Sequence, residues 1–204
     1  MTDRIDSLAH RKGYHHGNLE DSLIEAARRL VAEKGPSAFT LADAARLAGV
    51  TPAAVYRHFA DRTALLGALA GRGYVAFEQA LRQALEGHAT PLEGFTAMGD
   101  AYLAFAREEP GYYAAMFSSG LRDLQVKGAG PNAFEALIEG ITAALPLSRE
   151  RAVPLAMQIW SLSHGVATLD AGGMFNAEQC PTTAQDTLRA GALALLRNAM
   201  GGER

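Results

Sequence analysis

One segment, from Thr40 to Phe59, constrains the fold more than any other part of the chain. It reads T-L-A-D-A-A-R-L-A-G-V-T-P-A-A-V-Y-R-H-F. Thr40 followed three residues later by Asp43 is a capping box, which predicts the start of a helix. Gly49 predicts the end of that helix, and Thr51-Pro52 predicts the start of another, because threonine suits an N-cap and proline the first helical position. Two short helices joined by a tight glycine turn are typical of a helix-turn-helix unit.

The spacing inside this segment supports the same interpretation. Ala45 falls where the two helices should touch, so a small side chain is needed there. Gly49 lies four residues later, where the chain leaves the helix with a positive φ. Val50 and Val55 then supply apolar contacts that hold the second helix across the first. The residues after Val50 are therefore expected to stand out from the surface, where they can enter a DNA groove.

The rest of the chain predicts an all-α fold. The composition is 49% hydrophobic and 20% charged, as in ordinary globular proteins. Alanine and leucine dominate, apolar residues recur at three- and four-residue steps, and no strand-like alternation is visible. Loops are expected at 120–131 and 172–181. The expected helices are 19–34, with Asn18 as its N-cap, 41–48, 52–59, 62–86 capped by Asp61, 91–108, 111–118, 132–145, 149–170 and 183–199.

Charge and cysteine content limit the function only coarsely. The formal net charge is −3, so a DNA-facing surface must come from local arrangement rather than bulk charge. A single cysteine, Cys180, excludes an internal disulfide framework. The chain has no apolar run long enough to cross a membrane and no signal-peptide core near its start. We therefore expect a cytoplasmic protein without a membrane partner.

Two stretches resemble the TetR family of bacterial transcription regulators. The first is the lead-in from Gly17 to Gly35, and the second is T-P-A-A-V-Y-R-H-F-A-D-R-T-A-L-L, from Thr51 to Leu66. Arg62 stands where family members usually carry a lysine. The resemblance implies a flexible arm over 1–16, a DNA-binding domain over 17–66, and a ligand-binding and dimerisation domain over 67–204.

The resemblance also implies roles for individual residues. The third helix would lie in the major groove with its first turn at the base edges, and neighbouring side chains would hold phosphates. Tyr56 could instead close the core of the small domain, and His58 could make a structural hydrogen bond. The DNA-binding residues implied are Arg11, Lys12, Thr40, Thr51, Pro52, Ala53, Ala54, Tyr56, Arg57, His58 and Arg62.

A looser resemblance covers the C-terminal half. Some TetR-like proteins carry the motif W-x-x-x-H-G in a late helix, which is Trp160 to Gly165 here; Trp160 and His164 should share a helix face. The family implies that the helices 149–170 and 183–199 dimerise, while earlier helices enclose a pocket for a small apolar or aromatic ligand. Aromatic residues at helical spacing are also common in ordinary cores. The candidate lining residues are Phe77, Phe95, Met98, Tyr102, Phe105, Tyr112, Tyr113, Met116, Phe117, Trp160 and His164.

These observations predict a homodimeric repressor that reads a palindromic operator in double-stranded DNA and leaves it when a ligand binds. The alternative is a helical adaptor that binds protein rather than DNA. We expect no enzyme, because the chain lacks G-x-S-x-G, P-loop, H-E-x-x-H and dinucleotide-binding motifs. We expect no cofactor and no metal, because His10, His15 and His16 match no zinc-site spacing.

Overall fold

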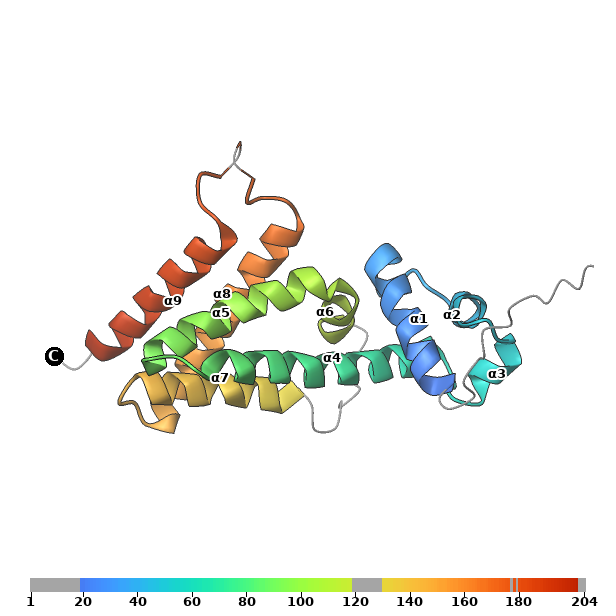
Figure 1. Ribbon diagram of the computed structural model, residues 1–204, viewed down its shortest axis with the longest axis horizontal. Coiled ribbons are helices and arrows are strands. Elements are labelled where there is room, and N and C mark those ends of the chain that lie inside the picture. The colour runs from blue at the N-terminus through green and yellow to red at the C-terminus, as the bar shows by residue number, and fades with distance from the viewer. Residues whose placement is uncertain (1–18, 119–129, 177, 179, 202–204) are drawn as a thin grey trace, which may run out of the picture.

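The computed structural model describes residues 19–118, 130–176, 178 and 180–201. Within this part of the chain the regular structure is entirely helical (Figure 1). None of the described helices is both long enough and apolar enough to cross a membrane. The helices are α1 (Leu19–Lys34), α2 (Leu41–Ala48), α3 (Pro52–Tyr56), α4 (Arg62–Leu85), α5 (Pro91–Glu108), α6 (Pro110–Met116), α7 (Gly130–Ala144), α8 (Arg149–Ala171) and α9 (Ala184–Gly201).

The helices enclose two hydrophobic cores. The first core is built by α1, α2, α3 and the start of α4, and it includes Leu23, Phe39 and Val55. We call this part the N-terminal domain. The second core is formed by the rest of α4 with α5 to α9, and it includes Phe77 and Ile141. We call this part the C-terminal domain.

Helix α4 joins the two domains because its two ends are buried in different cores. Leu65 and Leu69 belong to the first core, whereas Phe77 and Leu81 belong to the second. In Figure 1, α1, α2 and α3 lie at one end of the molecule, and α9 lies at the other. The boundary between residues 66 and 67 remains a prediction.

The predicted all-α fold is confirmed over the described residues. Four predicted helix boundaries were wrong by two or three residues. Helix α6 ends at Met116 rather than residue 118, and α9 ends at Gly201 rather than residue 199. Helix α3 ends at Tyr56 rather than Phe59, because the next residues form a turn in which the amides of His58 and Phe59 both donate to the carbonyl of Val55. Helix α7 begins at Gly130 rather than residue 132, which is acceptable because proline fits the first helical turn. Asn18 and residues 120–129 of the expected loop lie outside the described residues.

Candidate functional site

Helix α2 begins with the predicted capping box. The Asp43 amide donates to Thr40 Oγ1 at 3.1 Å, and the Thr40 amide donates to Asp43 Oδ2 at 3.1 Å. These bonds satisfy amides that a helix start otherwise leaves without partners. Hydrogen bonds from the Thr40 hydroxyl and amide also lower the pKa of the Asp43 carboxyl. The start of α2 is therefore fixed by hydrogen bonds between Thr40 and Asp43.

The turn after α2 also forms as predicted. Gly49 has a φ of 70°, a left-handed conformation that is costly for residues with a Cβ. The Val50 amide donates to the Ala45 carbonyl at 2.9 Å, and the Gly49 amide donates to the Arg46 carbonyl at 3.2 Å. This pair of bonds is a Schellman motif, which ends a helix and redirects the chain. Ala45 and Val55 are both buried in the first core, where the sequence placed the packing of α3 on α2.

Helix α3 presents one face to the core and one to solvent. Val55 is fully buried and Phe59 is 6% exposed, whereas Tyr56 is 61% exposed. The Thr51 side chain makes no capping hydrogen bond, contrary to our expectation, so its hydroxyl is not held by the helix start. The predicted DNA-binding residues on the exposed side are Thr40, Thr51, Pro52, Ala53, Tyr56, Arg57 and His58.

Ala54 differs from its neighbours Pro52 and Ala53 because it is buried, at 8% exposed. Its predicted contact with a base edge remains a prediction. Arg62 is also engaged inside the protein: its Nη1 donates to the Pro36 carbonyl, and its guanidinium lies 5.9 Å from the centre of the Phe39 ring. Its predicted phosphate contact remains a prediction. Arg11 and Lys12 lie outside the described residues.

Sequence analysis did not single out Arg46, which lies one turn before Gly49. Its side chain is 76% exposed and pairs with Asp43 at 2.6 Å. It adds an exposed cation close to the helix-turn-helix turn. The available signal was its position on the solvent side of an amphipathic helix, but that pattern alone does not distinguish a DNA contact from ordinary surface charge.

The C-terminal domain contains a cavity of about 30 Å³ among α4, α5, α7, α8 and α9. Four predicted residues line it: Phe95, Met98, Tyr102 and Trp160. The predicted set consists mainly of aromatic residues. It therefore missed the aliphatic and polar residues that line the cavity, including those of α9. The lining residues that were missed are Leu81, Thr96, Gly99, Asp100, Leu137, Ile159, Ser163, Leu188, Arg189, Ala192 and Leu193.

The other predicted lining residues do not border this cavity. A small aromatic cluster forms beside it, in which the Tyr113 hydroxyl lies 2.8 Å from His164 Nδ1. Phe117 contacts both residues of the predicted motif, at ring-centre distances of 4.5 Å to His164 and 6.4 Å to Trp160. This confirms that Trp160 and His164 share a helix face. Burial lowers the pKa of His164 and raises that of Tyr113.

The remaining predicted residues belong to the core or to the domain junction. Phe77, Phe105 and Met116 are buried in the second core. Tyr112 lies under the Arg28 guanidinium, 5.7 Å from it, and so faces α1 rather than the cavity. The structure therefore gives these four side chains a packing role and not direct contact with the cavity.

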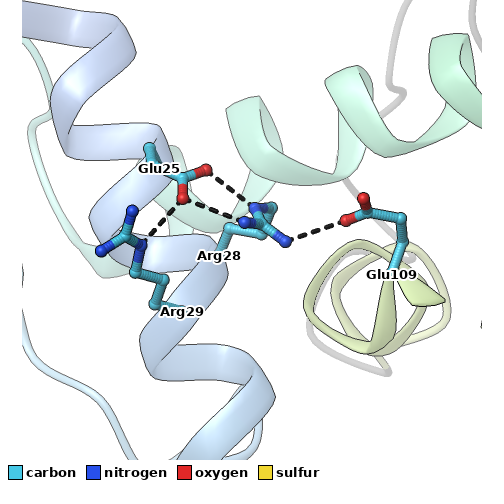
Figure 2. A network of polar contacts seen from close by, with 4 residues as sticks. All are labelled: Glu25, Arg28, Arg29 and Glu109. Carbon is cyan, nitrogen blue, oxygen red and sulfur yellow. Dashed lines mark hydrogen bonds and ion pairs between the residues drawn. The ribbon is translucent and has the colours of Figure 1, made fainter. Parts of the chain in front are cut away.

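An ion-pair network joins the two domains at the contact between α1 and α6. Arg28 Nη1 donates to Glu109 Oε2 at 2.9 Å, and Arg28 Nε donates to Glu25 Oε2 at 2.7 Å. Figure 2 shows Arg28 between the two carboxylates, with Arg29 on the other side of Glu25. The hydrogen bond from Arg28 is the main cause that lowers the pKa of Glu25 to about 2.

Backbone packing makes this junction tight. Gly111 is buried on α6, and a Cβ added to it would lie 2.2 Å from the Arg28 carbonyl oxygen on α1. No side chain fits at that distance. Because α6 also carries Tyr113, one short helix contacts both the aromatic cluster and the N-terminal domain.

Comparisons with known proteins agree with this architecture. Residues 23–69 match the family described as bacterial regulatory proteins, tetR family, and residues 95–195 match the tetracyclin repressor-like C-terminal domain. No match was found among curated proteins. A solved structure of a protein with unknown function from Rhodococcus sp. RHA1 is 30% identical, with a TM-score of 0.75 over 92% of this chain and 98% of its own.

Two more distant structures share the fold. A TetR-like transcriptional regulator from Rhodococcus sp. RHA1 is 16% identical, with a TM-score of 0.67 over 91% of this chain and 97% of its own. A TetR-family transcriptional regulator from Streptomyces coelicolor is 18% identical, with a TM-score of 0.66 over 89% of this chain and 99% of its own.

The exposed third helix, the Schellman turn and the separate helical C-terminal domain define a helix-turn-helix, DNA-binding transcription regulator. The chain belongs to the TetR family.

Proposed function

We propose that this protein is a homodimeric repressor that binds a palindromic operator and is released from it by a small-molecule effector. The observation that carries this proposal is the exposed face of α3, which lies at the opposite end of the molecule from α9 (Figure 1). With α3, the helix proposed to contact the bases, at one end of the molecule, the other end is available for dimerisation. Two such helices in a twofold dimer would read the two halves of a palindrome.

The exposed side chains of α3 suggest a division of roles on DNA. Thr51, which precedes α3, and Pro52 and Ala53, which begin it, offer methyl and methylene groups to thymine methyls at the base edges. Tyr56 and His58 are suited to phosphate oxygens, which fix position without reading sequence. Arg57 can reach a guanine or a phosphate.

The proposed dimer face begins on α8. Residues at four-residue steps form one exposed row along this helix, and such a row is a ridge that can pack into the groove of a neighbouring helix. Its large apolar residues are 37–54% exposed, and a row of exposed apolar residues is typical of a face that another chain covers. The row consists of Val153, Met157, Ser161, Gly165 and Leu169.

Helix α9 continues this face. Its exposed row consists of Ala190, Ala194 and Asn198, which are small residues that allow a second helix to approach closely. Packing α8 and α9 against the same helices of a second copy would form a four-helix bundle.

We also propose that the chain belongs to the TetR subset with W-x-x-x-H-G, since Trp160 and His164 both contact Phe117.

Effector binding would require the C-terminal domain to open. The cavity of about 30 Å³ holds a few waters at most, whereas ligand sites span roughly 300–1,000 Å³. A ligand would therefore stabilise a wider arrangement of the helices around it. Helix α6 offers a route to the N-terminal domain, because Tyr113 bonds to His164 while Gly111 packs on Arg28.

A gel-shift titration with the DNA upstream of the gene tests the proposal. The wild-type protein should bind a defined site, and log affinity should fall linearly with log salt concentration. Tyr56→Ala and Arg57→Ala should each weaken binding by about 1–3 kcal/mol without changing helix content. If Arg57 contacts a phosphate, its loss should also reduce the salt slope by roughly 0.9, whereas loss of the uncharged Tyr56 should leave the slope unchanged.

Arg149→Ala is the matched control for Arg57→Ala, because it removes the same charge from the exposed start of α8, in the other domain. It should leave DNA affinity unchanged. Normal affinity in both α3 variants would contradict the assigned contacts. Failure of the wild-type protein to bind any upstream DNA, together with capture of a specific protein partner, would favour the adaptor alternative.

A further inference from the structure

The mouth of the cavity between α5 and α9 carries an ion pair. Arg189 Nη2 on α9 lies 3.0 Å from Asp100 Oδ2 on α5. Both residues line the inner cavity, and both also line an open groove on the surface outside it. We call this the outer groove; it is bordered by Thr90, Glu93, Thr96, Asp100, Arg189 and Leu193. Asp100 and Arg189 therefore border both the outer groove and the cavity.

The charges at the mouth favour a cation. The outer groove has two carboxylates, Glu93 and Asp100, against one guanidinium, Arg189. Glu93 is fixed in place because it closes the capping box of α5, where its Oε2 accepts from the Thr90 amide at 3.1 Å. Both acidic groups sit on α5, while the single cation sits on α9.

The ion pair can open on the arginine side. Arg189 has a long, flexible side chain that is 47% exposed, and it makes a single bond to Asp100. Exposed ion pairs of this kind add little stability, so breaking one costs little. Asp100 is short and held close to its helix. When Arg189 turns toward solvent, the carboxylate of Asp100 therefore stays at the mouth.

The cavity behind the mouth suits the rest of such a ligand. Phe95, Tyr102 and Trp160 line it, and apart from Arg189 the wall from α9 is aliphatic. Aromatic faces attract organic cations as well as apolar groups, and tryptophan does so most strongly. Ser163 is the buried polar residue of the lining, and its hydroxyl donates to the Ile159 carbonyl at 2.9 Å, so that bond already uses its proton.

We propose that the effector is a lipophilic organic cation, an amine or quaternary ammonium on an aromatic or aliphatic body. Its charge replaces Arg189 beside Asp100, and its body enters between α5 and α9. The proposal rests on the effector-controlled function above and adds the class of ligand. One face of α9 lines the cavity, and another carries the proposed dimer row. A ligand that displaces α9 would therefore also change the dimer interface.

Three probes of similar shape test the charge preference: 4-phenylbutylamine, 4-phenylbutyrate and 4-phenylbutanol, which are cationic, anionic and neutral at pH 7. Trp160 is the single tryptophan of the chain and lines the cavity, so its fluorescence reports binding directly. The amine should bind about tenfold more tightly than the butyrate, with the alcohol between them. A butyrate that binds as tightly as the amine would overturn the proposal, as would no fluorescence change with any probe.

Three variants test whether Asp100 binds the ammonium group of the amine. Asp100→Asn should weaken binding of the amine about tenfold and leave the alcohol unchanged. Arg189→Gln should bind the amine at least as tightly as the wild type. Glu33→Gln, which removes an exposed carboxylate from α1, controls for net charge and should have no effect. Unchanged amine binding in Asp100→Asn, or its loss in Arg189→Gln, would contradict the inference.

The titrations contain no DNA, so they separate this inference from the proposed function. A protein that binds its operator but shows no cation preference would contradict the ligand class alone. A protein that prefers the amine but binds no DNA would contradict the repressor proposal alone.

Discussion

Arg28 on α1 donates to Glu109 at the start of α6 at 2.9 Å, and the same arginine covers the Tyr112 ring at 5.7 Å. Beneath these side chains the backbones of α1 and α6 meet at Gly111. The N-terminal domain is therefore fixed to a helix that also carries Tyr113 of the aromatic cluster in the C-terminal domain. Changes at this contact should alter both stability and DNA binding.

The tight contact predicts a large effect from one methyl group. Gly111→Ala would place a Cβ 2.2 Å from the Arg28 carbonyl, so α6 must shift away from α1. We expect a loss of about 1–3 kcal/mol in the free energy of unfolding, measured by urea denaturation. Gly99→Ala on α5 is the matched control, since its nearest neighbour is Leu188 Cδ2 at 3.5 Å, and it should be neutral or stabilising. Equal effects from the two substitutions would show that the close contact is absent.

The left-handed conformation of Gly49 predicts a local defect. Gly49→Val forces a branched side chain into a φ of 70°, which should cost about 1–3 kcal/mol and displace α3. DNA binding should be lost in a gel shift, while the C-terminal domain stays folded. Ala42→Val, at an exposed position of α2 with ordinary helical geometry, should cost no more than about 0.7 kcal/mol. Unaltered operator binding by the Gly49 variant would contradict this role for the turn.

His164 predicts a pH dependence near neutrality. Burial lowers its pKa from the ordinary value of 6.5, so the unfolded state binds a proton more readily than the folded state. The stability is fully present above pH 6.5 and is lost as the pH falls from there toward the lower folded pKa. The melting temperature should therefore fall more between pH 7.5 and 5.5 in the wild type than in His164→Gln.

His88→Gln provides the comparison for this measurement, because His88 is exposed and is expected to follow the wild-type profile. If the His164 and His88 variants both kept the full wild-type loss on acidification, the stability change would have to come from other titrating groups.

The exposed row on α8 predicts a dimer that a single charge weakens. Met157 is 54% exposed and stands in the middle of that row. Met157→Glu should raise the dimer dissociation constant by at least about tenfold, because an unpaired carboxylate would be buried between copies. Sedimentation velocity over a concentration series measures this.

Val75→Glu is the matched variant for Met157→Glu, since Val75 is 47% exposed on α4, away from α8 and α9. It should leave the association unchanged. A Met157→Glu protein that still sediments as the wild type does would place the dimer face elsewhere.

Local sequence determined most of the fold and the reading helix. The capping box of Thr40 and Asp43, the positive φ of Gly49 and the burial of Ala45 and Val55 depend on residues within the single segment from Thr40 to Phe59. Such short-range features are visible in one sequence, and the structure confirms them. The same local reasoning did not predict the burial of Ala54, because a helix of five residues shows too few turns to fix its orientation.

The cavity and the junction depended on tertiary structure. Asp100 and Arg189 are far apart in the sequence, as are Arg28 and Glu109, and no periodicity links either pair. Only the packing of α5 against α9, and of α1 against α6, decides that these charges meet. The aromatic residues were visible in the sequence, but which of them border a cavity and which fill the core was decided by how the helices pack together.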